Sequence, residues 1–213
     1  MKRAWLVVAL VSGALFLALA AHAWRQELLA VDVALGDSFK GPERVWLRPT
    51  MKWLSLLGSY PVLIVLALVS LLALWRRDRK LALLFPVVMA GGFPVEQALK
   101  FLVWRPRPHL TAAGFPSGHS FTAVVWLGAL VYLLWRSGAN RGWRTAGTVA
   151  ALLAIVAVAC ARVYLGVHWP SDVLGGVTGG LAYLAVTLWW VEGRLQTAAR
   201  GAPGFPVPSP DHS

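Results

Sequence analysis

The stretch PSGHSFTAVVWLGALVYLLW, residues 116–135, places a short polar string directly before a long apolar run. The run, from about residue 120 to residue 135, is one of six apolar stretches that polar or turn-rich links separate. The other five cover about residues 5–21, 53–75, 81–104, 145–160 and 173–191. Because such runs are typical of helices that cross a bilayer, the sequence predicts an all-α, polytopic membrane protein with a bundle of six transmembrane helices.

The composition of the whole chain supports this interpretation. Of 213 residues, 58% are hydrophobic and only 14% are charged, and the mean hydropathy is +0.63. Such a chain is too apolar for an ordinary soluble domain. Because crossing a hydrocarbon core takes about 20 residues of helix, the chain has room for about six spans and their loops. We expect one domain over residues 1–195 and a disordered cytoplasmic tail over residues 196–213, whose end is rich in proline.

The distribution of charge argues against nucleic acid as a partner. The formal net charge is +11, but the 20 lysines and arginines are scattered in short groups instead of forming one patch. The single cysteine, Cys160, lies in an apolar run, which excludes an intrachain disulfide and a cysteine-based metal site.

The same basic residues predict the orientation, because lysine and arginine next to spans are retained in the cytoplasm. With the N-terminus inside, eleven of them lie inside and nine outside, and four of those nine belong to the clusters described below. We therefore expect a multi-pass protein of the cell inner (plasma) membrane. The first apolar run also has features of a signal peptide, with Lys2 and Arg3 before it and Ala21-His22-Ala23 after it, but its length favours an uncleaved span.

The first outer loop, about residues 24–52, mixes apolar and charged residues. One interpretation is a short helix lying on the membrane surface, and the other is a solvated connector. The pattern of the loop does not favour either.

Charged residues gather at span ends in three clusters. The first is KFLVWRPRP, residues 100–108, at the end of the third span, and the second is PSGH, residues 116–119, at the start of the fourth. The third consists of Arg162, His168 and Asp172, between the fifth and sixth spans. Two spans separate the second cluster from the third, so an even number of crossings places all three on the same face. Polar groups at membrane depth are costly unless they pair or act, so we expect the clusters to meet.

The first two clusters, together with Arg162 of the third, suit the binding of a phosphate group. Arginine offers a planar fork that matches phosphate oxygens, and Lys100, Arg107 and Arg162 can serve as the cations. Pro106 and Pro108 make a helix end near Arg107. Ser117 stands where a serine caps a helix and where backbone N–H groups attract anions, and Gly118 lets the backbone approach a phosphate closely. Taken alone, the string is equally compatible with an ordinary capped helix start.

The third cluster suits a nucleophile. His168 and Asp172 are four residues apart, and Pro170 between them is well placed to begin the sixth helix. A carboxylate there can accept a hydrogen bond from one ring nitrogen and leave the other nitrogen as the nucleophile. A solvated histidine and aspartate at a helix start is the alternative.

Other residues have simpler interpretations. We expect Arg105 to be an interfacial arginine that extends its charge toward water, although it could also line the site entrance. Glu96, four residues before Lys100, is expected to be the helix ion-pair partner of that lysine, and His109 to be a loop residue. Close helix packing is expected at two overlapping glycine pairs, formed by Gly175, Gly176, Gly179 and Gly180.

Together the clusters resemble a known signature. Lys100-x6-Arg107-Pro108, Pro116-Ser117-Gly118-His119 and Arg162-x5-His168-x3-Asp172, in this order and with this spacing, are similar to the motifs of the type 2 phosphatidic acid phosphatase superfamily, relatives of the vanadium haloperoxidases. One departure is Ala161, which stands where that family usually has serine. The loss of one hydroxyl should trim phosphate contacts without removing the nucleophile.

The resemblance implies a metal-free active site, without any cofactor, at the outer surface of the helical bundle. His168 would attack phosphorus to form a phosphohistidine, Asp172 would orient and polarise it, and His119 would protonate the leaving group and later help to activate water. The resemblance also implies a set of groups that bind the phosphate oxygens, namely Lys100, Arg107, Ser117, Gly118 and Arg162.

The function that follows is hydrolysis of lipid phosphate or diphosphate headgroups, of the undecaprenyl diphosphate, phosphatidate or phosphatidylglycerophosphate type. A protein buried in the membrane favours lipid substrates, because the tail can stay in the bilayer while the headgroup reaches an extracytoplasmic site. One alternative is a lipid phosphotransferase that uses the same phosphohistidine. Another is a noncatalytic membrane transporter or partner protein, against which the presence of every catalytic residue counts. The sequence favours no particular lipid and predicts no oligomeric state.

Overall fold

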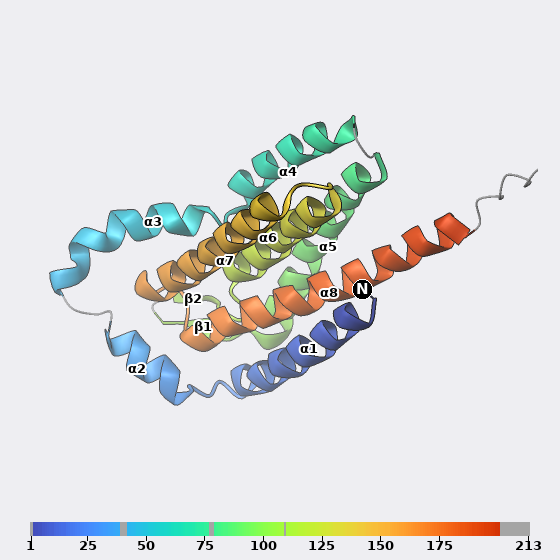
Figure 1. The fold of residues 1–213 in the computed structure, drawn as a ribbon. Helices are drawn as coiled ribbons and strands as arrows, with labels where there is room; N and C mark the ends of the chain where they lie inside the picture. Colours follow the sequence, from blue (N-terminus) through green and yellow to red (C-terminus); the bar gives the residue numbers. More distant parts are fainter. Residues whose placement is uncertain (1, 39–41, 77–78, 109, 201–213) are drawn as a thin grey trace, which may run out of the picture.

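The computed structural model describes residues 2–38, 42–76, 79–108 and 110–200, and these residues are mostly helical (Figure 1). The helices are α1 (Lys2–Trp24), α2 (Ala30–Ser38), α3 (Arg48–Leu56), α4 (Tyr60–Trp75), α5 (Arg79–Val103), α6 (Gly118–Arg136), α7 (Arg141–Tyr164) and α8 (Pro170–Arg200), with a 3-10 helix, η1 (Pro42–Leu47), before α3. Two short antiparallel strands, β1 (Pro106–Arg107) and β2 (Leu110–Ala113), form a hairpin between α5 and α6 that the sequence did not predict.

Four helices in the described part of the chain are long and apolar enough to cross a membrane: α1, α6, α7 and the segment Pro170–Arg194 of α8. A fifth candidate is a bent pair, Val45–Leu56 and Tyr60–Val69, whose two helices meet at 46°. The predicted third span coincides with α5, a helix of 25 residues. A polytopic helical membrane protein is therefore confirmed, whereas the count of six spans stays a prediction.

The predicted second span, residues 53–75, is broken in the structure. Helix α3 ends at Leu56, and α4 begins at Tyr60 after the extended residue Ser59. Pro61 suits the first turn of a helix but removes a backbone donor that a continuous helix would need. A Cβ on Gly58 would lie 2.7 Å from the backbone oxygen of His119, so the break packs directly against the start of α6.

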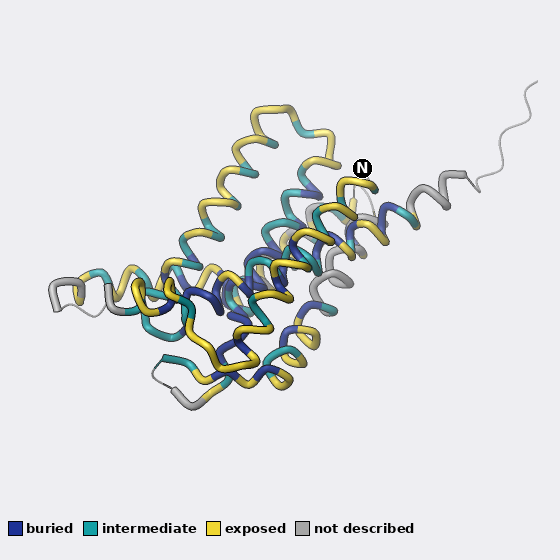
Figure 2. The backbone as a smooth tube through the Cα atoms, turned by 90° about the horizontal axis from the view of Figure 1, so that it is seen from below, coloured by how far each residue is buried: buried dark blue, intermediate teal, exposed yellow. Residues whose placement is uncertain are grey.

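The long helices pack around α6 and α8. Helix α8 lies between α1 and α6, and α7 packs on another side of α6 (Figure 1). Buried positions gather along the middle of the bundle, while the outward turns of the outer helices are exposed (Figure 2). Large apolar side chains are among those exposed, for example Leu10, Leu72 and Leu153. Such outward apolar faces are what a bilayer would cover.

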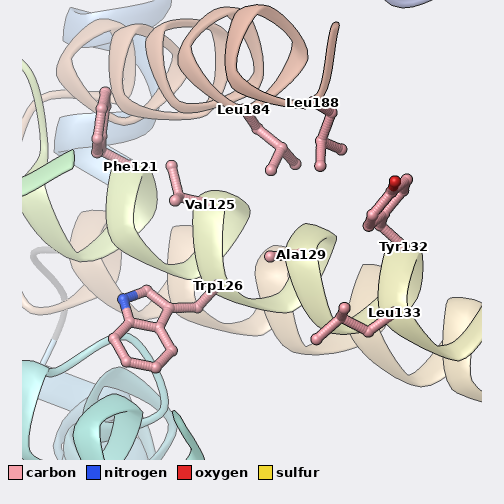
Figure 3. Packing of buried hydrophobic residues seen from close by; sticks show 8 residues of the cluster. All are labelled: Phe121, Val125, Trp126, Ala129, Tyr132, Leu133, Leu184 and Leu188. Carbon is pink, nitrogen blue, oxygen red and sulfur yellow. The ribbon is translucent and has the colours of Figure 1, made fainter. Parts of the chain in front are cut away.

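Helix α6 forms the centre of the hydrophobic core. Its buried residues, Phe121, Val125, Trp126, Ala129, Tyr132 and Leu133, pack with Leu184 and Leu188 of α8 (Figure 3). A helix that is apolar around most of its circumference is stable only when neighbouring elements surround it. The core therefore fixes α6, and with it the polar string of residues 116–119 at the start of α6.

The glycines of α8 let this helix approach α6 at backbone distance, as the sequence predicts. A Cβ on Gly180 would lie 2.7 Å from the backbone oxygen of Phe121, and one on Gly176 would lie 2.5 Å from that of Ser117. Close contact between small residues is the usual way in which membrane helices pack tightly. Here it brings the start of α8 against the first turn of α6.

We predict that Gly180→Ala destabilises the protein, because the new methyl group would meet backbone that cannot rotate away. The expected loss is about 1–3 kcal/mol in the free energy of unfolding, measured by thermal unfolding in detergent. Gly13→Ala on α1 is the matched control, because a Cβ there meets nothing within 4 Å. The control should keep or slightly raise stability, and equal losses in the two variants would contradict the packing described above.

Candidate active site

The three polar clusters lie at one end of the bundle, as the counting of spans predicts. The end of α5, the hairpin, the start of α6, the end of α7 and the start of α8 all meet there (Figure 1). A backbone hydrogen bond joins the second cluster to the third, because the N–H of Ser117 donates to the carbonyl of Asp172 over 2.9 Å. The clusters are therefore held together by the backbone as well as by side chains.

His168 and Asp172 form a buried pair at the start of α8. The chain leaves α7 through Gly166, whose φ of 67° lies in the left-handed region that favours glycine, and Pro170 begins α8 as expected. His168 Nδ1 lies 3.7 Å from Asp172 Oδ2, which is longer than a hydrogen bond. The carboxylate therefore faces the ring chiefly as a charge, and Nε2 is the ring nitrogen turned away from it.

Burial lowers the pKa of His168 to about 4, because a desolvated imidazole resists a positive charge. The neighbouring Asp172 opposes this effect, whereas Arg162 and Arg107 add to it. The ring is therefore neutral near pH 7. A neutral imidazole with one nitrogen free of a proton is the form that can act as a nucleophile.

His119 completes the pair of histidines that the sequence predicts. It lies in the first turn of α6, half-buried, and the charges of Arg162, His168, Lys100 and Arg107 all act on it. The two arginines also act on each other. The structure thus brings both histidines and all three predicted cations within electrostatic reach of one another.

Arg162 has a donor that fits a bound anion. Its Nη1 donates to the hydroxyl of Ser55 on α3 over 3.0 Å, while its Nε is buried without a hydrogen-bond partner among the described residues. A buried donor left unsatisfied costs about 1–3 kcal/mol, so a ligand oxygen at this place would be stabilised. Ser55 was not predicted, since nothing in its local sequence links it to Arg162, 107 residues away.

Ser117 is the N-cap residue of α6, but its side chain does not make the predicted capping bond. Its hydroxyl instead accepts a hydrogen bond from Ser120 Oγ over 3.1 Å. The first N–H groups of a helix have no partner within the helix, and its N-terminus attracts anions. The start of α6 therefore keeps its donors for a ligand.

Lys100 is held against the start of α6 by the ion pair that the sequence predicts. Its Nζ contacts Glu96 Oε1, and Glu96 is fully buried. The other oxygen of Glu96 accepts hydrogen bonds from Tyr60 at 3.3 Å and from Gln97 at 2.7 Å. A Cβ on Gly118 would lie 2.6 Å from Glu96 Oε1 and 3.1 Å from Lys100 Nζ, so the glycine makes this close approach feasible.

Arg107 occupies the position that the two prolines predict, just beyond the end of a helix. Helix α5 ends at Val103, and Arg107 lies on β1, where its Nε donates to the carbonyl of Ala113 over 3.1 Å. The hairpin therefore fixes its guanidinium. His109 lies outside the described residues.

The prediction for Arg105 was wrong, because this side chain is buried, with only 2% of its surface exposed. Nη1 donates to Ser171 Oγ and Asp172 Oδ1 over 2.6 and 2.9 Å, and Nη2 donates to the carbonyl of Glu27 and to Asp32 Oδ2 over 2.7 and 3.0 Å. Two carboxylates compensate the buried charge, which is why it does not need water.

Asp32 is a second site residue, besides Ser55, that sequence reasoning missed. It lies in α2, so part of the predicted first loop is helical, while its place on the membrane surface stays a prediction; the carboxylate is fully buried. The available signal was weak: the chain has only nine Asp and Glu, and this one stands in an apolar stretch. Among the described residues, no group of three or more His, Cys, Asp and Glu could hold a metal ion.

Comparison with known proteins decides the family. Residues 79–196 match the PAP2 superfamily, over more than half of the chain and across all three clusters. The chain belongs to the PAP2 superfamily. It is therefore a phosphatase of the PAP2 type, as the motifs predict.

Individual PAP2 relatives match most of the chain. One is YbjG of Escherichia coli (strain K12), which is named as an undecaprenyl-diphosphatase. It is 30% identical over 179 residues, which cover 73% of this chain and 86% of the relative. Phosphatidylglycerophosphatase B of Bacillus subtilis (strain 168) is 28% identical over 175 residues, which cover 78% of this chain and 86% of the relative.

The fold also matches a solved PAP2 structure. The crystal structure of a transmembrane PAP2-type phosphatidylglycerolphosphate phosphatase from Bacillus subtilis superposes with a TM-score of 0.76 and 27% identity. The match covers 91% of this chain and 98% of that one. The helical arrangement around the site is therefore shared with a membrane phosphatase of this superfamily.

The neutral, buried His168 predicts a loss of stability in acid. As pH falls from 6.5 to about 4, the unfolded chain protonates this imidazole and the folded protein does not, so the unfolded state gains protons and the free energy of unfolding decreases. The expected loss is on the order of 3 kcal/mol. Thermal unfolding of the ligand-free protein across this range should show a larger loss than in His168→Asn, which does not titrate. Equal losses would mean that His168 is not held neutral.

Proposed function

We propose that this PAP2 phosphatase hydrolyses lipid phosphate or diphosphate headgroups, of the undecaprenyl diphosphate, phosphatidate or phosphatidylglycerophosphate type, through a phosphohistidine on His168. The observation that carries the proposal is the convergence of His168, His119 and Asp172 with three cations at one end of a membrane bundle. The names of the relatives support the substrate class, since they refer to undecaprenyl diphosphate and phosphatidylglycerophosphate.

In the first step, His168 Nε2 attacks phosphorus, and a P–N bond forms as the P–O bond to the leaving group breaks. His119, as the imidazolium that a bound anionic phosphate favours, gives its proton to the departing oxygen. Asp172 stabilises the positive charge that develops on the attacking imidazole, and its place 3.7 Å from Nδ1 suits this role. In the second step, water attacks phosphorus and loses a proton to His119, the P–N bond breaks, and inorganic phosphate leaves.

The phosphate oxygens would lie among donors and cations that this chain fixes in advance. Lys100, Arg107 and Arg162 supply positive charge, the start of α6 from Gly118 onward supplies backbone N–H groups, and Ser117 adds its hydroxyl. Groups that are already oriented stabilise charge in the transition state without the cost of reorganising solvent. The unpartnered Nε of Arg162 is the clearest sign of such a place.

We place the site on the extracytoplasmic face of the cell inner membrane. The distribution of lysine and arginine supports this orientation, because the basic residues that flank the opposite end of the bundle are of the kind retained in the cytoplasm.

His168→Asn should abolish phosphate release, by roughly three orders of magnitude or more, because among the described residues no other imidazole at this site is backed by a carboxylate. The assay is inorganic phosphate released from undecaprenyl diphosphate, phosphatidylglycerophosphate and phosphatidate in parallel, by purified protein in detergent. His22→Asn, an exposed histidine on α1, is the control and should remain active. Retained activity in His168→Asn would rule out the proposed nucleophile, and a newly phosphorylated lipid without free phosphate would indicate a transferase.

An apolar groove of about 440 Å³ between α4, α5 and α6 supports a lipid substrate. Tyr60 and Thr122 are among the residues that line it. Tyr60 donates to Glu96, the partner of Lys100, and Thr122 donates to the carbonyl of Gly118 over 2.6 Å. Two residues that line the groove thus contact neighbours of the proposed phosphate-binding groups, and we assign the groove to a hydrocarbon chain of the lipid.

Ala67→Trp should fill this groove, since Ala67 of α4 lines it. We expect kcat/KM for a long-chain lipid phosphate to fall about tenfold or more, equivalent to about 1.4 kcal/mol, while a short-chain phosphate is hydrolysed as before. Ala150→Trp, in the groove between α6 and α7, is the matched control. Equal effects on long and short chains, or equal effects of the two variants, would remove the groove from substrate binding.

A further inference from the structure

A buried charge cluster stands behind the catalytic pair, on the side of Asp172 away from the ring. It consists of Arg105, Asp32 and Ser171 together with Asp172 itself. We propose that Arg105 and Asp32 are positioning residues that fix the Asp172 carboxylate and set the negative charge that acts on His168. The proposal rests on the roles proposed above for His168 and Asp172.

The two oxygens of Asp172 have separate fixed donors. Oδ1 accepts from Arg105 Nη1 over 2.9 Å, and Oδ2 accepts from the backbone N–H of Trp169 over 3.0 Å. A carboxylate held at both oxygens cannot rotate about its side-chain bond. Oδ2 therefore stays toward Nδ1 of His168, and Arg105 is the side chain that ensures it.

Asp32 fixes Arg105 and the first turn of α8 together. Its Oδ2 accepts from Arg105 Nη2 over 3.0 Å and from the hydroxyl of Ser171 over 2.7 Å. Its Oδ1 accepts from the backbone N–H of Ser171 over 2.8 Å, and the N–H of Leu29 also donates to Oδ2, over 3.0 Å. Ser171 directly precedes Asp172. The carboxylate of Asp32 therefore holds both Arg105, which binds Asp172, and the backbone next to Asp172.

The cluster also determines the net charge beside His168. Two carboxylates share one guanidinium, so one net negative charge remains beside His168. Without Asp32 the cluster would be neutral, and without Arg105 it would carry two like charges. A negative charge favours the positive imidazole that forms during attack, whereas the cations Arg107 and Arg162, which also act on His168, oppose it. The negative charge of the cluster thus offsets the effect of the phosphate-binding cations on the protonation of His168.

Arg105 differs from the phosphate-binding arginines in its contacts. Both of its Nη atoms donate to protein oxygens, and its side chain is almost completely buried. It can therefore act on the reaction through Asp172 but offers little to a phosphate group. Its removal should lower kcat while leaving the KM for the lipid nearly unchanged.

The decisive experiment is a pair of opposite charge changes and their combination. Arg105→Gln should lower kcat by roughly 10- to 100-fold. It should also move the acid limb of the kcat–pH profile, where activity falls as His168 becomes protonated, to higher pH, because more negative charge then favours protonation of His168. Asp32→Asn should move the acid limb to lower pH. The double variant restores one net negative charge, so its acid limb should return to that of the wild type, and Arg105→Lys should keep the wild-type limb with a partial loss of kcat.

Matched controls come from the opposite end of the bundle. Arg136 Nη1 lies 3.0 Å from Glu192 Oε1 in an ion pair whose carboxylate is buried and whose guanidinium is partly exposed. Arg136→Gln and Glu192→Gln should change thermal stability without moving the pH profile. Acid limbs that do not move, or that move in the same direction in Arg105→Gln and Asp32→Asn, would overturn the proposal.

The same series separates this inference from the proposed function. If His168→Asn keeps its activity, the proposed nucleophile fails. If His168→Asn is inactive while the Arg105 and Asp32 variants keep the wild-type kcat and profile, only the positioning role fails. If Arg105→Gln does not accumulate as folded protein, two other variants still test the proposal. Arg105→Lys should keep the wild-type acid limb, and Asp32→Asn should move the acid limb to lower pH.

Discussion

The contact between the first turn of α6 and the first turn of α8 is the constraint on which the site depends. Gly176 allows the two backbones to meet, and the N–H of Ser117 donates to the carbonyl of Asp172. Helix α6 is packed in the core along most of its length. The contact with α6 therefore fixes the position of the start of α8. A side chain at residue 176 would separate His168, the proposed nucleophile, from the groups that we propose bind the phosphate.

Charge is arranged in two layers around His168. On one side are the cations at the ends of α5 and α7 and on the hairpin, together with the start of α6, and this side suits a phosphate. On the other side are Asp172, Arg105 and Asp32, which are paired with one another and shielded from water. The imidazole lies between a cationic layer and a layer with net negative charge. This separation suits the role proposed for His168, because the ring faces the phosphate-binding groups on one side and a partner for a developing positive charge on the other.

The sequence was sufficient for the parts of the structure that local patterns encode. Apolar runs predicted the helices, counting spans placed three clusters at one end, and the spacing of Glu96 and Lys100 predicted their ion pair. The break between α3 and α4 was not foreseen, because Gly58 and Pro61 lie in an otherwise apolar run. The burial of Arg105 and the part played by Asp32 depend on contacts 73 residues apart in the chain, which no periodicity records. The residues missed were therefore those whose partners lie far away in the chain.

The covalent step is the central claim, and locating the phosphoryl group tests it most directly. The protein would be mixed with a lipid diphosphate or monophosphate labelled on the transferred phosphate, quenched during turnover under alkaline conditions, and digested for mass spectrometry. Our account predicts one phosphoryl group on the peptide that contains His168, absent when Asn replaces that residue. A label on His119, or the absence of any label while phosphate is released, would contradict it.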